Sequence, residues 1–208
     1  MKTNKIITGM VTFLLLFVLA SPSFPYGYGT AGDDPLITMF KKVIKEAKKK
    51  DKDWDKLKEI IKDSKVPIVN LDKYFSVNLY AKFDKSLEDK SLKDLINSTV
   101  NLVFLSMMEK FDLIQKKEFK DYDFSKGRLA LNDKYYREIF KGNVAKYDKK
   151  NGTNINETIM KSFQSIQDTI GKPAKFGVGG EAPNPDKYAA EYGTIKKSLK
   201  TVFPSFEG

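Results

Sequence analysis

The stretch VNLVFLSMM, residues 100–108, is apolar on nearly every side when it is wound as an α-helix. A helix on the surface of a globular protein has one apolar stripe, whereas a helix that is apolar all round needs neighbours on every side. The segment is therefore predicted to be the central helix of a bundle. Leu102, Phe104 and Leu105 lie off the main stripe and are expected to be buried all the same. The stripe itself comprises Leu92, Ile96, Val100, Val103, Met107 and Phe111.

The segments on both sides of this stretch repeat apolar residues every three or four positions, which is the helical spacing. None shows a convincing period-two alternation that would predict a strand. The sequence VPIVN (66–70) is expected to interrupt the helices, and no fixed internal repeat is visible. We predict an all-α fold, a single-domain bundle of about seven helices, over 34–47, 54–61, 71–87, 91–111, 124–147, 154–170 and 184–202.

The N-terminal residues are typical of a cleaved secretory signal peptide. Lys2 and Lys5 precede an apolar run from Ile6 to Ala20, which ends in small or branched residues. This run is shorter than the roughly 20 residues that a membrane-spanning helix needs. We expect a signal peptide over 1–20, a flexible Gly/Pro/Tyr-rich leader over 21–32 and a helical domain over 33–208. The expected location is periplasmic or secreted, with no transmembrane segment in the mature chain.

The absence of two residue types excludes several kinds of catalytic and metal-binding site. The chain has 208 residues, no cysteine and no histidine. Disulfides, thiolate metal sites and cysteine nucleophiles are therefore excluded, and the usual general base is missing. No catalytic, metal-binding or cofactor-binding residue is predicted, so a binding protein is a better expectation than an enzyme. A hydrolase with a carboxylate pair remains an alternative, although nothing singles out a pair among the 27 acidic residues. A second alternative is a helical domain that binds a small molecule, and such a domain would need a large apolar cavity.

Lysine is concentrated near the start of the helical domain. Residues 41–65 hold eleven lysines against six carboxylates, and the whole chain has a formal net charge of +10. Arginine, whose planar fork favours bidentate phosphate recognition, occurs only at Arg128 and Arg137. We therefore expect attraction of anionic partners without reading of a nucleic-acid sequence. The predicted surface, opposite the apolar stripe of the first helix, consists of Lys41, Lys45, Lys48, Lys49 and Lys52.

One loop is a further candidate. The sequence KFGVGGEAPNP (175–185) contains Gly177, Gly179 and Gly180, whose amides could turn toward an anion. The alternative interpretation is a simple connection between two helices. The acidic sequence DKDWD (51–55) is not a calcium loop, because lysines stand where an EF-hand needs a glycine and a final acid.

Together these patterns predict an exported, soluble helical binding or interaction protein of the cell envelope. Its partner would be an anionic envelope component or another protein. The alternative is that the lysines have no binding role and are only the solvent-exposed side of two helices.

Overall fold

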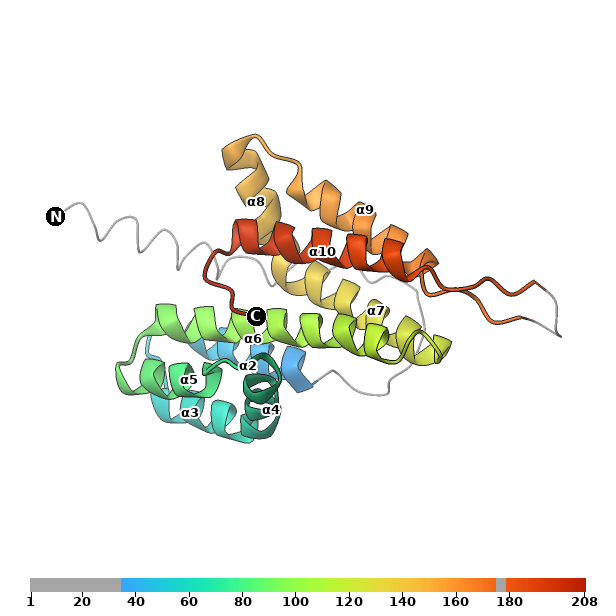
Figure 1. Ribbon diagram of the computed structural model, residues 1–208. Coiled ribbons are helices and arrows are strands. Elements are labelled where there is room, and N and C mark those ends of the chain that lie inside the picture. The colour runs from blue at the N-terminus through green and yellow to red at the C-terminus, as the bar shows by residue number, and fades with distance from the viewer. Residues whose placement is uncertain (1–34, 175–178) are drawn as a thin grey trace. The chain divides into compact units, whose positions relative to one another are not determined.

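The computed structural model describes residues 35–174 and 179–208, and within them every regular element is a helix (Figure 1). The all-α prediction is confirmed for this part of the chain. The predicted signal peptide and leader lie outside the described residues. The elements are α2 (Pro35–Ala47), α3 (Trp54–Asp63), α4 (Lys65–Phe75), α5 (Leu79–Glu88), α6 (Leu92–Lys116), α7 (Tyr122–Tyr135), the π-helical segment η1 (Tyr136–Phe140), α8 (Lys141–Asn151), α9 (Ile155–Asp168) and α10 (Pro185–Val202).

The chain divides into two compact units. Among the described residues, the first unit comprises 35–106 and 207–208, and the second comprises 107–206. Helix α6 crosses the division, so its N-terminal part belongs to the first unit and its C-terminal part to the second. No pattern in the sequence predicted this division.

The central helix is buried as predicted. All eleven residues from Ser98 to Met108 are buried, and none of them is more than 7% exposed. Leu102, Phe104 and Leu105, which lie off the main stripe, are each 0% exposed. Two polar side chains in this stretch have hydrogen-bond partners: the Thr99 hydroxyl donates to the carbonyl of Leu95 at 2.7 Å, and the Asn101 side chain accepts the amide of Glu207 at 3.2 Å. The prediction from all-round apolarity is therefore confirmed.

The helix predicted over 71–87 is wrong, because it is two helices. Helix α4 ends at Phe75, Ser76 adopts a left-handed conformation with φ of 55°, and α5 begins at Leu79. The predicted interruption at 66–70 is also wrong, since these residues lie inside α4. Pro67 is tolerated there because it occupies the first helical turn, where its missing N–H would have no helical partner.

The helix predicted over 124–147 is interrupted as well. Helices α7 and α8 are joined by η1, in which the hydrogen bonds follow the wider π-helical pattern. Because two of the seven predicted helices divide in this way, the described residues contain nine α-helices and one π-helical segment.

The two units contain the same helix–turn–helix. In the first unit, the carboxylate of Asp72 accepts hydrogen bonds from the amides of Leu79 (2.6 Å) and Tyr80 (2.9 Å). In the second, the carboxylate of Asp148 accepts them from the amides of Ile155 (2.9 Å) and Asn156 (2.8 Å). Each turn has a left-handed residue four positions after its aspartate, and each second helix has an asparagine N-cap. Residues 65–75 of α4 and 141–151 of α8 are offset by 76 positions, as are the two aspartates.

A second correspondence lies further toward the N-terminus of each unit. Helix α3 begins within the sequence KDWD (52–55), at Trp54, and α7 begins within KDYD (120–123), at Tyr122, 68 positions later. The N-cap carboxylates of Asp53 and Asp121 accept the amides of Lys56 and Phe124, each at 2.9 Å. The two correspondences make a repeat whose spacing is not fixed, because it changes from 68 to 76 residues in the region of α7 and η1. The sequence-based interpretation that no fixed repeat is visible therefore stands.

Replacing Val103 with aspartate should destabilise the fold by more than about 3 kcal/mol, because a buried unpaired charge cannot recover its hydration. Thermal or urea unfolding measures this. Lys93→Asp, at an exposed position in the first turn of the same helix, is the control and should change stability little. A Val103→Asp protein that melts like the wild type would contradict the central placement of α6.

Candidate functional site

The predicted lysine surface lies at the junction of α2 and α3. Because α2 ends at Ala47, Lys41 and Lys45 lie on the helix, whereas Lys48, Lys49 and Lys52 lie in the connection that follows. Lys48 and Lys49 were predicted to lie opposite the apolar stripe of the first helix, but they lie beyond the end of that helix. We call Lys48, Lys49 and Lys52 the lysine corner. Lys45, Lys48 and Lys49 are exposed, and Lys41 and Lys52 are partly buried.

A buried carboxylate shapes this corner. Glu46 is only 2% exposed and forms an ion pair with the Lys49 ammonium at 2.7 Å. Its other oxygen accepts the amide of Asp53 at 3.2 Å. The hydrogen bond from Lys49 lowers the pKa of Glu46 below its usual range, while burial acts in the opposite direction. Lys52 donates to the carbonyl of Lys49 at 3.0 Å. The connection is thus fixed by side chains that the sequence presents as surface charges.

The charge of the corner is only partly neutralised. Glu46 pairs with Lys49, and Asp53 serves as the N-cap of α3. No carboxylate in the described part of the chain forms an ion pair with Lys45 or Lys48. The opposite side of α2 is buried, including Ile37, Val43 and Ile44. Lys45, on α2, and Lys48, just after its end, are therefore both exposed to solvent.

The two ends of the glycine-rich loop are joined by backbone hydrogen bonds. Lys172 and Glu181 form an antiparallel bridge with backbone hydrogen bonds of 2.9 and 3.0 Å, and their side chains form an ion pair at 3.1 Å. Gly171 has φ of 76°, and a Cβ there would lie 2.6 Å from the carbonyl oxygen of Glu181, so glycine is required. Gly179 and Gly180 are exposed, whereas Gly177 lies outside the described residues. An anion-binding role for this loop stays a prediction.

The sequence did not reveal a cluster of buried polar atoms around η1. Within the described residues, Arg128 Nε, Asn132 Oδ1, Asp133 Oδ1 and Asn143 Oδ1 are buried without a hydrogen-bond partner. All four lie on the α7–η1–α8 run, close to the place where the two copies of the repeat differ in length. Asn132 is 0% exposed, and its amide nitrogen donates to the carbonyl of Met107 at 3.0 Å. Buried polar atoms of this kind are usually satisfied by internal water.

The direction of the carboxyl pKa shifts is relevant to the alternative that the protein is a hydrolase. The pKa values of Glu118 and Glu157 are lowered by hydrogen bonds from Lys120 and Lys161. Burial alone would raise the pKa of Asp148, but hydrogen bonds from Thr153 and from the amides of Asn156 and Ile155 outweigh it. A general acid needs a raised carboxyl pKa, and these shifts, like that of Glu46, go the other way.

Two structural findings concern the other predicted site types. No helix within 35–174 and 179–208 is long and apolar enough to cross a membrane. Within the same ranges, no three acidic side chains are grouped so that they could hold a metal ion. Comparisons with protein-family models, curated proteins and solved structures found no match to this chain.

Glu46→Gln should lower the melting temperature at pH 7, because it removes the ionised partner of Lys49. A carboxyl group with a lowered folded-state pKa stabilises the protein above its unfolded pKa of about 4.3, and this contribution is lost as the pH falls through the folded-state pKa. The difference between wild type and variant should therefore shrink toward pH 3 in thermal melts. The exposed Glu59→Gln serves as the control. Equal melting of wild type and Glu46→Gln at pH 7 would contradict the anchoring role.

Asn132→Leu should leave stability unchanged or increase it, because it removes a buried oxygen that has no partner. The carbonyl of Met107 keeps its helical partner four residues later within α6. The contrasting variant is Asn101→Leu. It should lower the free energy of unfolding by about 1–2 kcal/mol, because the amide of Glu207 would lose its hydrogen bond of 3.2 Å to the Asn101 side chain. Urea unfolding of both variants tests this. A clear loss of stability in Asn132→Leu would instead indicate a bound internal water.

Proposed function

We propose that this chain is an exported helical binding protein of the cell envelope that attracts anionic partners through the lysine corner and the adjoining lysines of α2. The observation that carries the proposal is the exposure of Lys45 and Lys48 without an ion pair in the described chain, opposite a fully packed helix face. The net charge of +10 supports it. Export rests on the sequence pattern of residues 1–20.

The chemistry of lysine favours attraction without shape recognition. An ammonium group is a compact, strongly hydrated point charge, and it lacks the planar fork with which arginine recognises phosphate or carboxylate. Near an anionic membrane or polymer each such lysine contributes on the order of 1 kcal/mol, and salt screens this contribution. Binding should therefore depend on the charge density of the partner and on ionic strength. The hydrolase alternative gains no support from the carboxyl pKa values described above.

The triple variant Lys45→Glu, Lys48→Glu, Lys50→Glu should lose binding to heparin and to anionic liposomes at low salt. It spares Lys49, because a glutamate at that position would face the buried carboxylate of Glu46. All three positions are exposed, so the melting temperature should change little. Wild-type retention on a heparin column should fall steeply as salt rises toward physiological concentration.

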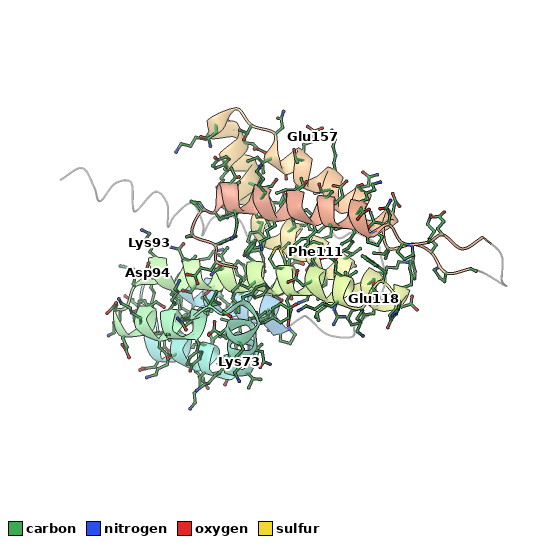
Figure 2. All side chains as sticks on the ribbon, in the orientation of Figure 1. Lys73, Lys93, Asp94, Phe111, Glu118 and Glu157 are labelled. Carbon is green, nitrogen blue, oxygen red and sulfur yellow. The ribbon has the colours of Figure 1, made fainter. Side chains whose placement is uncertain are left out.

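A matched control carries the same change of charge elsewhere in the first unit. Lys73, Lys85 and Lys93 are exposed on α4, α5 and α6, and Lys73 and Lys93 are marked in Figure 2. Their triple replacement with glutamate should retain most of the binding. Failure of the wild-type protein to bind at low salt would refute the proposed function. Equal loss in both triple variants would show that only net charge matters.

A further inference from the structure

We propose that Glu207 and Gly208 form a strap on the first unit, and that this strap opens and closes while the helices beneath it stay folded. The strap is a conformational device, in which a short piece of chain covers a small site and can release it. The inference concerns the first unit alone and does not depend on the proposed function. Its basis is the set of contacts that the two residues make.

The first unit is formed by two separate pieces of the chain. Its helices lie in the piece that ends at Ser106, and Glu207 and Gly208 belong to the same unit, although residues 107–206 separate them from it in sequence. Sequence neighbours therefore do not explain why the strap lies on these helices. Specific contacts must hold it there.

The strap is held through both the side chain and the backbone of Glu207. The Glu207 carboxylate forms an ion pair with the ammonium group of Lys82, which lies on α5. The backbone amide of Glu207 donates a hydrogen bond of 3.2 Å to the side-chain oxygen of Asn101, which lies on α6. One residue of the strap is thus bound by two helices at once.

The second residue of the strap fits only as glycine. Gly208 has φ of 99°, a backbone conformation that residues with a side chain rarely adopt. A Cβ at this position would lie 2.6 Å from Cδ2 of Leu105 and 3.5 Å from Cδ1 of Phe75. Leu105 is 0% exposed, so close packing leaves it little room to move aside. The site therefore accepts an acidic residue followed by glycine, and the strap supplies both.

The contacts of the strap can open at low cost. The side chains of Lys82 and Glu207 are 48% and 35% exposed, so water and dissolved salt compete with their ion pair. Asn101 is only 5% exposed, and its side-chain oxygen accepts the Glu207 amide. Opening breaks this hydrogen bond but admits water to the same oxygen, which then has a new partner. Local opening of this kind needs less free energy than unfolding of the helices below.

An open strap uncovers a small surface of mixed chemistry. It consists of the Lys82 ammonium group, the Asn101 side-chain oxygen and the apolar atoms of Leu105 and Phe75 that face Gly208. The occupant that fits this surface is the strap of the same chain, because its covalent connection makes closing an intramolecular step. The strap of a second copy would make the same contacts, as in domain swapping, and the test below distinguishes the two.

Hydrogen exchange of the Glu207 backbone amide, followed by NMR on the full chain, measures opening directly, because this amide is the one bonded to Asn101. In the wild type it should exchange more slowly than an unprotected amide, but faster than the amide of Leu105 in the buried part of α6. Lys82→Gln should speed the exchange of Glu207 by up to about fivefold at low salt, and the difference should vanish at high salt. Lys85→Gln, at another exposed position of α5, is the matched control and should change nothing.

Two further variants test the recognition of each residue of the strap. Gly208→Val should speed the exchange of the Glu207 amide by about tenfold at every salt concentration, because valine is strained at this φ and would meet Leu105. Lys82→Glu should also open the strap. Adding Glu207→Lys to it should restore slow exchange, which would not happen if either position mattered only for general stability.

Equal exchange rates at Glu207 and Leu105 would overturn the proposal, because the strap would then open only when the whole unit unfolds. Exchange of Glu207 at the rate of an unprotected amide, or an unchanged rate in Lys82→Gln at low salt, would also refute it. Protection that rises with protein concentration, together with a dimer in light scattering, would show that the strap occupies a second copy and would refute the intramolecular strap. Heparin and liposome binding enter none of these outcomes, so this inference and the proposed function stand or fall separately.

Discussion

The burial of residues 98–108 of α6 on every side of the helix is the constraint on which both units depend. Its N-terminal part supplies Leu95, Leu102 and Phe104 to the first unit, where Asn101 also binds the C-terminal backbone at Glu207. Its C-terminal part holds the second unit through polar contacts as well as packing. The hydroxyl of Tyr188 donates to the carbonyl of Phe111 at 2.9 Å, and Tyr192 donates to Asp112 at 2.9 Å. Helix α10 is therefore held by the C-terminal part of α6 within the second unit.

The repeated turns show what the acidic residues of this chain do. Asp53 and Asp121 cap helices, Asp72 and Asp148 each bind two backbone amides, and Glu46 holds a connection in place. Hydrogen bonds to charged groups are among the stronger ones in proteins. Two of the six acids in residues 41–65, Glu46 and Asp53, are held in backbone contacts of this kind.

The sequence predicted the features that follow from apolar periodicity and missed those that depend on local geometry. All-round apolarity identified α6. The spacing of Leu71, Phe75, Leu79 and Phe83 continues through the turn at Ser76, so periodicity alone could not divide α4 from α5. No residue pattern in the sequence indicates the π-helical segment. At the candidate site, the exposure of Lys45 and Lys48 was predictable, whereas the burial of Glu46 and its ion pair with Lys49 were not.

The position of the unit boundary has a consequence for how the protein unfolds. The division falls between Ser106 and Met107, within the most buried stretch of α6 rather than in an exposed linker. Domains joined by a linker can melt one at a time. Here both units include part of α6. Unfolding of either unit should therefore disrupt α6 and destabilise the other unit, so we expect the two units to unfold together.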